Sequence, residues 1–419
     1  MNALRPFQSK NYRLYFSGQS ISLMGTWMQR TAVYWVIYEM TSSPMMVGLA
    51  VFATQFPSFV FSIIGGVFSD RYDRFKILVI TQLASLVQAV ILTAIVWTGH
   101  YEVWHILTLS VLLGTINAFD VPARQALVYD MVDSKEHLPN AIALNSSMVH
   151  TARLIGPALS GIVLEHLGAS ICFLINALSF VAVLMSLMFM KLPRYKKPER
   201  INKALTDLKN GFVYLRDTPA ISKVMLMLAM VSLLSLPYIT LLPVYARDIF
   251  EGKASTFGYL NSLVGIGALG GAFMLASLKP GANLKKILFI NTLIFGAGLI
   301  AFSHMTNLHL AWPFLIMAGF GMMSQTTISN TLIQTTVTPS MRGRVLSYYA
   351  MAFFGMQPIG SLIIGSLAQY IGQDNTMLLQ GILTIGIALI FLPFLRRREM
   401  KSTDKIKMEQ LEERSAEAS

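Results

Sequence analysis

The 419-residue chain is 54% hydrophobic and only 13% charged, a composition that excludes an ordinary soluble domain. Its net charge of +12 is compatible with a nucleic-acid binder, but the basic residues lie in short segments between long apolar runs. The single cysteine, Cys172, excludes a disulfide framework and a cysteine-based metal site.

Apolar runs long enough to cross a membrane recur along the whole chain. A helix rises about 1.5 Å per residue, so about 20 apolar residues cross a hydrocarbon core about 30 Å thick. We therefore predict an all-α membrane protein. Its twelve transmembrane helices are expected to start near Arg13, Met45, Ile77, Trp104, Asn140, Ile171, Ala220, Phe257, Ile287, Leu310, Val345 and Met377. The first run is about 25 residues long, too long for a cleavable signal.

The chain also contains an internal repeat. The pattern G-x4-G-x6-G occurs at Gly156, Gly161 and Gly168 and again, about half a chain later, at Gly360, Gly365 and Gly372. Duplication within a very apolar chain is typical of secondary transporters, whose two halves move about a shared site. The repeat predicts two six-helix bundles, one over residues 1–190 and one over residues 220–395.

The two bundles are expected to be joined by residues 191–219. Apolar residues in this segment are three or four positions apart, at Ile201, Leu205, Leu208, Phe212 and Leu215. This spacing predicts an amphipathic helix that lies on the inner membrane surface and tethers the halves. Residues 396–419 form a charged tail, which we expect to be solvated in the cytoplasm.

Basic residues are concentrated in alternate loops. They cluster at the N-terminus, after every second apolar run and in the tail, whereas the opposite loops contain only Arg247 and Lys253. Cytoplasmic loops carry an excess of Lys and Arg, so this pattern places both termini in the cytoplasm. We expect a multi-pass protein of the inner membrane that does not bind nucleic acid.

The end of the second apolar run resembles the signature loop of the major facilitator superfamily, G-x-x-x-D-R-x-G-R-[RK]. Gly66, Asp70 and Arg71 match this pattern, Arg74 stands near a basic position, and Asp73 replaces the second glycine. The resemblance implies a gate on the inner side, where Asp70 would hold neighbouring basic groups or the start of the eleventh helix.

Other segments are similar to the branch that contains enterobactin-exporter-like and macrolide-efflux-like proteins, the transmembrane secretion effectors or type 3 drug:proton antiporters. The similar segments include residues 25–29, 120–126, 140–146, 152–157 and 342–345. This resemblance implies the major facilitator fold and export of drug- or siderophore-like molecules by alternating access, with proton antiport. A proton-coupled uptake carrier of the same fold is the alternative.

Gly156 and Pro157, with Gly161, resemble the fifth-helix motif associated with antiporters in this superfamily. A bent helix with a smooth glycine face would let the other half pivot against it. The same residues also suit ordinary helix packing.

Three charges stand out within the predicted helices, since a charge near the bilayer centre costs about 2.5–3.5 kcal/mol on insertion scales. Counted from the inner helix ends, Arg30 lies about 25 Å deep, Arg153 about 20 Å and Asp120 about 14 Å. We predict an Asp120–Arg153 ion pair, which is either a structural staple or a switch for proton or cargo. Arg30 has no evident partner, so it either attracts an anionic, acceptor-rich cargo or extends toward the outer headgroups.

The second half offers uncharged polar groups for the pathway. They are Tyr238, Thr240, Gln325, Asn330, Gln334 and Gln357, which either contact cargo or bridge helices. The sequence has no H-E-x-x-H, Walker A or G-x-S-x-G motif, and its seven histidines show no ligand spacing. We therefore expect no enzyme, no cofactor and no metal. The expected partners are a small-molecule substrate, protons and membrane lipid, and the protein is expected to be a monomer.

Overall fold

The computed structural model describes residues 2–192, 204–279 and 281–396, which are helical nearly throughout and contain no strand. The first part comprises η1 (Asn2–Gln8), α1 (Lys10–Thr41), α2 (Pro44–Arg71), α3 (Arg74–Trp97), α4 (Val103–Met131), η2 (Lys135–His137), α5 (Leu138–Leu167) and α6 (Ala169–Met188). The rest comprises α7 (Ala204–Asp217), α8 (Pro219–Leu234), η3 (Leu236–Leu241), α9 (Leu242–Val244), η4 (Tyr245–Ile249), α10 (Ala254–Ala276), α11 (Leu284–Ser303), α12 (Leu308–Thr336), α13 (Arg342–Ala350), η5 (Met351–Gly355), α14 (Met356–Ile371) and α15 (Gln373–Arg396).

The predicted helices form close to their expected positions. Ten of the described helical segments are long and apolar enough to cross a membrane. The helices α1 and α12 are also long enough, at 32 and 29 residues, but they are not among the ten. Polar residues such as Arg30 in α1 and Gln325 in α12 lower their hydropathy, so a count of twelve spans stays a prediction.

Local capping explains several helix ends. Asp73, which replaces a glycine of the signature loop, accepts a hydrogen bond from the Phe75 amide at 3.0 Å and begins α3. Asn283 caps α11 in the same way through the Lys286 amide at 3.0 Å. Such side chains satisfy amides that have no partner within the helix. The departure from the superfamily pattern therefore has a structural role.

The repeated glycine pattern ends two equivalent helices. Gly168 and Gly372 follow α5 and α14 with φ angles of 84° and 81°. This left-handed conformation is readily adopted only by glycine, which allows the chain to reverse tightly. The third glycine of each repeat therefore terminates a helix.

The second glycine of each repeat brings the two halves together. A Cβ on Gly161 would lie 2.7 Å from the Ala254 carbonyl of α10, and α5 also approaches Gly258 there. The counterpart Gly365 of α14 approaches Pro44 and Gly48 of α2, and its Cβ would lie 2.6 Å from the Pro44 carbonyl. The two contacts are equivalent under the internal repeat, and both need glycine because backbone meets backbone.

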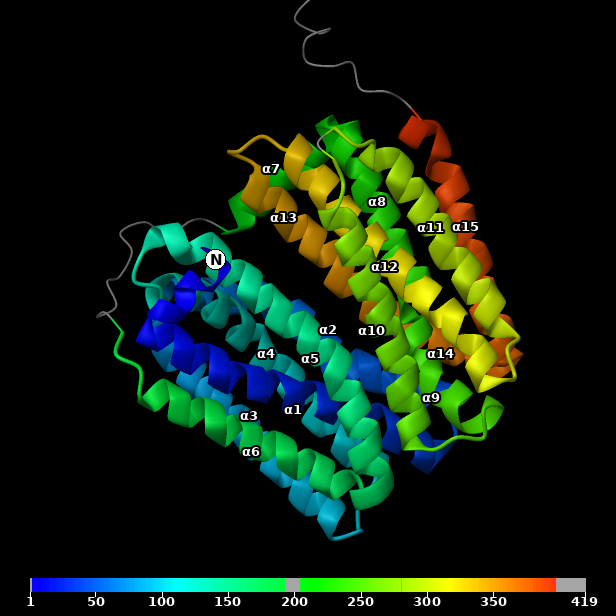
Figure 1. Ribbon diagram of the computed structural model, residues 1–419, viewed down its shortest axis with the longest axis horizontal. Coiled ribbons are helices and arrows are strands. Elements are labelled where there is room, and N and C mark those ends of the chain that lie inside the picture. The colour runs from blue at the N-terminus through cyan, green and yellow to red at the C-terminus, as the bar shows by residue number, and fades with distance from the viewer. Residues whose placement is uncertain (1, 193–203, 280, 397–419) are drawn as a thin grey trace, which may run out of the picture.

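The two ends of the molecule differ in how closely the bundles approach each other. We call the end where α1 begins and α15 ends the terminus side, and the other end the distal side. Figure 1 shows the helices α1 to α6 diverging from α8 to α15 on the terminus side and converging near α9 on the distal side. Both glycine crossings lie in the distal parts of their helices.

The connecting helix α7 packs on the second half. Gly211 lies against Tyr348 and Arg344 of α13, and Leu215 is buried while Phe212 is exposed. The Tyr214 hydroxyl accepts a hydrogen bond from the Thr338 amide at 3.3 Å. The described part of the predicted amphipathic segment is therefore helical and docked on α13. Ile201 and the tail residues 397–419 lie outside the described residues.

Adjacent glycines in α2 provide a test of the packing. A Cβ on Gly65 would overlap the Ala118 carbonyl of α4, whereas a Cβ on Gly66 would meet no atom within 4 Å. Gly65→Ala should lower the free energy of unfolding by about 1–3 kcal/mol, because backbone atoms must move apart. Gly66→Ala is the matched control and should gain up to about 1 kcal/mol of helix propensity. Thermal unfolding of purified protein measures both, and equal melting temperatures would contradict this packing.

Candidate functional site

The two arginines Arg30 and Arg153 meet at one indole ring. The Arg30 guanidinium carbon lies 4.7 Å from the centre of the Trp27 ring, and that of Arg153 lies 5.7 Å from it. Trp27 is three residues before Arg30 and therefore shares a face of α1 with it. Gly156 of α5 packs on the Trp27 Cβ, which brings the middle of α5 close to the ring.

Neither arginine in this cluster has an acidic partner. In residues 2–192, 204–279 and 281–396, no carboxylate lies within ion-pair distance of Arg30 or Arg153. Both side chains are half-buried, and a cation above an indole face gains about 0.5–2 kcal/mol without being neutralised. The cluster is therefore a concentration of positive charge within the helices.

A small polar hollow adjoins Arg30. It is lined by Thr26, Gln29, Val33, Thr54, Ser110 and Leu113. The three hydroxyls donate to carbonyls of their own helices, and the Gln29 amide donates to Gln88. Arg30 is thus the charged donor of a hollow whose other polar groups are already engaged.

The cluster also faces the second half of the chain. Arg153 lies within electrostatic range of Tyr238 in η3, a residue that is fully buried. One residue further along α5, the Leu154 carbonyl accepts a hydrogen bond from Ser262 of α10 at 3.2 Å. The two arginines therefore belong to the first half but lie at its boundary with the second.

The predicted Asp120–Arg153 ion pair is wrong. Asp120 is 4% exposed, and its Oδ2 lies 3.4 Å from Arg124 Nε, one turn along the same helix. Its Oδ1 accepts hydrogen bonds from Thr81 at 2.9 Å and from Gln82 at 2.7 Å. The helix α4 packs mainly on α2 and α3, whereas α5 packs mainly on α1, α6 and α10. The helices α4 and α5 follow each other in sequence but are not close neighbours, so Arg153 does not reach Asp120.

A second group of contacts joins the halves at the distal side. The Tyr38 hydroxyl at the end of α1 donates a hydrogen bond to the Asp248 carboxylate of η4. The neighbouring Arg247 donates to the Tyr38 carbonyl at 3.2 Å and to Ser42 Oγ at 3.2 Å. We call Tyr38, Ser42, Arg247 and Asp248 the distal latch. The π-helical turn η4 places Arg247 and Asp248 together toward α1.

The predicted gate residues lie on the terminus side. Arg74 at the start of α3 pairs with Asp70 at 3.9 Å, and the Asp70 side chain is 78% exposed. An ion pair this exposed contributes little to stability. Arg71 is exposed, and Gly66 borders open space, so the close packing of this helix end depends on Gly65.

The polar residues of the second half are not gathered into one site. Gln325 is fully buried within α12 and donates to Ser329 Oγ at 3.5 Å. Gln334 and Asn330 are half-buried and bonded to each other at 2.9 Å, one turn apart on α12. Gln357 is half-buried on α14. The structure brings Arg30 and Arg153 together, but it leaves these amides apart from them.

The antiporter-like motif occupies two different contacts. Gly156 packs within the first half on Trp27, whereas Pro157 and Gly161 face Gly258 and Ala254 of α10. The motif thus runs from the cationic cluster to the boundary between the halves.

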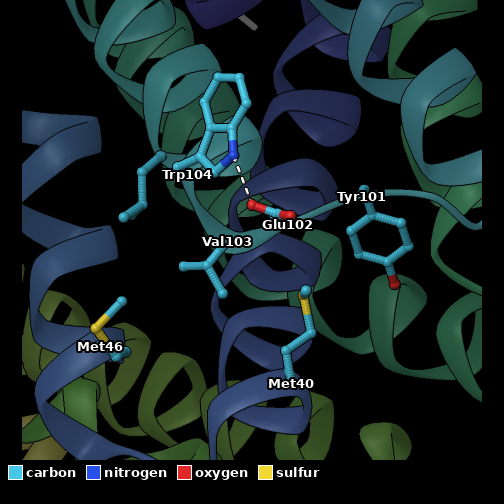
Figure 2. A pocket seen from close by; sticks show the side chains of 7 residues that line it. Met40, Met46, Tyr101, Glu102, Val103 and Trp104 are labelled. Atoms are coloured by element: carbon cyan, nitrogen blue, oxygen red, sulfur yellow. Dashed lines mark hydrogen bonds between the residues drawn. The ribbon is translucent and has the colours of Figure 1, made fainter.

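A larger hollow on the distal side has a different character. Figure 2 shows it between the end of α1, the start of α2 and the start of α4, lined by Met40, Met46, Tyr101, Glu102, Val103 and Trp104, with Leu107 completing the lining. Its Glu102 carboxylate accepts a hydrogen bond from the Trp104 indole at 2.8 Å. Aromatic residues at a helix end are typical of the membrane interface, so this hollow fits lipid chains better than polar cargo. Among the described residues, no group of three or more His, Cys, Asp or Glu side chains is arranged to hold a metal.

Trp27, Tyr38 and Asp248 were not predicted as site residues. The three-residue spacing of Trp27 and Arg30 was a readable signal, since such residues share a helix face. The contact between Tyr38 and Asp248 joins residues 210 positions apart and left no local signal. Arg247 entered the predictions only as a basic residue of an opposite loop, and Arg124 only within the similar segment 120–126, yet both form specific contacts.

Comparison with known proteins agrees with this architecture. The chain is similar to the staphyloferrin A transporter of Staphylococcus aureus, with 26% identity over 394 residues, 93% of this chain and 97% of that one. It is 25% identical to an enterobactin exporter of Shigella flexneri over 388 residues, covering 91% of each protein. It is 23% identical to macrolide efflux protein A of Streptococcus pyogenes over 392 residues, covering 91% of this chain and 96% of that one.

Solved structures show the same fold at low sequence identity. A bacterial homologue of the lysosomal transporter Spinster, in an inward-facing conformation, matches with a TM-score of 0.71 and 13% identity over 92% of this chain and 96% of that one. A peptide transporter bound to alafosfalin matches with a TM-score of 0.74 and 13% identity over 92% of this chain and 95% of that one. The transmembrane secretion effector family matches residues 1–419. The chain therefore belongs to the transmembrane secretion effector family of the major facilitator superfamily, a family of multi-pass membrane transporters.

Proposed function

We propose that this protein exports small organic molecules across the inner membrane by alternating access, in exchange for protons. The observation that carries this proposal is the pair of repeat-related glycine crossings, which bring the two helical bundles into backbone contact on the distal side. Relatives named as an enterobactin exporter and a macrolide efflux protein support transport out of the cell. A transporter of this kind works by exposing one central site to each side in turn.

Side-chain exposure supports an open terminus side. On the terminus side of the Leu154 contact, α5 is exposed around most of its circumference, at Ile142, Ala143, Ser146, Ser147, Val149 and His150. Basic residues such as Lys10 and Lys286 lie at helix ends on this side. Since basic loops face the cytoplasm, we assign this conformation as inward-facing, with both termini in the cytoplasm.

The distal latch is the proposed outer gate. Tyr38 and Arg247 connect α1 to η4 across the boundary between the halves. Outward opening requires the distal ends to separate, which breaks these contacts. The free energy of the latch therefore sets part of the balance between inward- and outward-facing states.

Asp120 is the proposed site of proton coupling. It is buried, and its carboxylate is held by Arg124, Thr81 and Gln82. Protonation removes the charge that Arg124 needs, so the two side chains separate when a proton binds. Such a change inside the first bundle is large enough to bias its packing.

Export itself is tested by accumulation in cells. Cells that express the protein should retain less of at least one member of a panel containing a macrolide, enterobactin and staphyloferrin A. Dissipating the proton gradient should remove the difference, because antiport draws on that gradient. Cells without the gene are the control. Greater accumulation in expressing cells would instead indicate an uptake carrier.

The outer gate is tested by labelling from outside the cell. Thr26→Cys, in a Cys172→Ser background, places a thiol beside Arg30 for reaction with a membrane-impermeant maleimide. Tyr38→Phe should raise the labelling rate about tenfold, since losing about 1.4 kcal/mol of a charge-assisted hydrogen bond shifts a two-state equilibrium by that factor.

The matched control for this test is Lys253→Met. Lys253 pairs with Glu165 across the same boundary at 3.5 Å, but its side chain is 77% exposed. An exposed pair contributes less than about 1 kcal/mol, so labelling should change much less. Equal changes in labelling rate for Tyr38→Phe and Lys253→Met would show that the distal latch is not the main contact that keeps the outer side closed.

Proton coupling is tested with the pair Asp120→Asn and Arg124→Gln. Both substitutions break the ion pair, but only Asp120→Asn removes the carboxylate. In reconstituted vesicles, Asp120→Asn should retain cargo exchange and lose its acceleration by a proton gradient, whereas Arg124→Gln should keep that acceleration. Both should lower the melting temperature. If Asp120→Asn still responds fully to the gradient, Asp120 is only a structural staple.

A further inference from the structure

We infer that the Arg30–Trp27–Arg153 cluster binds the cargo, and that the cargo is an organic anion with at least two negatively charged acceptor groups. This inference rests on the proposed function, because it assigns a chemical class to the exported molecule. It uses contacts that the export mechanism above does not require.

Charge is the first argument. The two guanidinium groups lie 4.7 and 5.7 Å from the centre of one ring and interact electrostatically, so their like charges repel. The indole face attracts each cation but carries no net charge with which to neutralise them. In the part of the chain that the structure describes, neither group has a carboxylate within ion-pair distance. A bound dianion removes this repulsion, whereas a neutral or cationic molecule does not.

Donor geometry is the second argument. A guanidinium has five N–H donors arranged to bind a carboxylate through two parallel hydrogen bonds. Residues 2–192, 204–279 and 281–396 supply neither Arg30 nor Arg153 with a hydrogen-bond acceptor, so their donors are available. Both groups lie over the Trp27 ring. Two such groups on one ring can engage two acceptors of one molecule.

Position is the third argument. Arg153 lies halfway along α5 and within electrostatic range of Tyr238 in the second half. Arg30 adjoins the polar hollow between α1, α2 and α4. Two further titratable groups interact with the cluster, His150 with Arg153 and Tyr34 with Arg30. The cluster thus lies where a molecule moving between the two bundles would meet both arginines.

The alternative is that the cluster only fastens α1 to α5. Arg153 on the Trp27 ring is enough to join α5 to α1. Arg30 is on α1, as Trp27 is, so it joins no further helix and adds only repulsion between the two cations. The two explanations differ in ligand binding, because a fastening has no affinity for anions.

The test is a fluorescence titration of the purified full-length protein in neutral detergent. The probes are isophthalate, a planar dianion, its neutral dimethyl ester, and benzoate, a monoanion. Isophthalate should bind at least about tenfold more tightly than benzoate, because it adds a second charge-assisted pair of hydrogen bonds. The ester should show no saturable binding. Raising the salt concentration should weaken isophthalate binding in the wild-type protein.

Substitutions locate the binding site. Arg30→Gln and Arg153→Gln should each weaken isophthalate binding about tenfold, the effect of losing one charge-assisted interaction. Lys253→Gln removes an exposed distal cation and should bind as the wild type does. If a Gln variant does not fold, the corresponding Lys variant keeps the charge. It should retain salt-dependent binding that is weaker, because the two-donor geometry is lost.

The results separate this inference from the proposed function. Binding of the ester as tight as that of isophthalate, or unchanged affinity in both Gln variants, would overturn the inference. Export of uncharged compounds that survives Arg30→Gln would do so too, and would leave the proposed function standing. Arg-dependent binding of isophthalate in a protein that exports none of the panel would support the site and defeat the export proposal.

Discussion

The close approach of backbones at Gly161 and Gly365 is the constraint on which the rest of the structure depends. In lipid there is no hydrophobic force between helices, so their association relies on close packing and hydrogen bonds. Each glycine meets a carbonyl of the other half, at Ala254 and at Pro44, where any Cβ would collide. Because both crossings lie distally, they join the bundles at one end and leave the other end free to open. Arg153 of the cationic cluster lies about two turns before Gly161 on α5.

The first half contains two contrasting solutions to the problem of charge within a membrane. The Asp120 carboxylate forms an ion pair with Arg124 and accepts hydrogen bonds from Thr81 and Gln82. Arg30 and Arg153 share an aromatic ring and have no acid. A charge within a membrane is costly and is almost always paired with another group. The contrast within one bundle therefore argues that the arginines have a partner from outside the chain.

Sequence patterns predicted the helices far better than the contacts between them. Apolar length determines where a helix can cross a bilayer, and so the predicted starts lie within four residues of those observed. The repeat also predicts that Gly161 and Gly365 are equivalent positions, and both lie at contacts between the halves. The predicted Asp120–Arg153 pair is wrong because it requires α4 and α5 to be neighbours, as they are in the sequence. In space α5 lies against α1, α6 and α10. The signature-loop pattern pointed to Gly66, but the close contact belongs to Gly65, since one residue turns a helix by about 100°.

The backbone is duplicated, but the charge is not, and this asymmetry bears on how the transporter would work. Both arginines stand on the first bundle, while the second contributes the neutral Tyr238 at the same boundary. In the proposed cycle, a bound anion therefore stays in contact with Arg30 and Arg153 throughout. Movement of the second bundle changes only whether protein or water lies on the other side of the anion. Affinity then depends mainly on the first bundle, whereas access depends on the distal latch and the glycine crossings. Such a transporter can release its cargo when water replaces the second bundle beside the anion, because hydration of the anion competes directly with the two guanidinium groups.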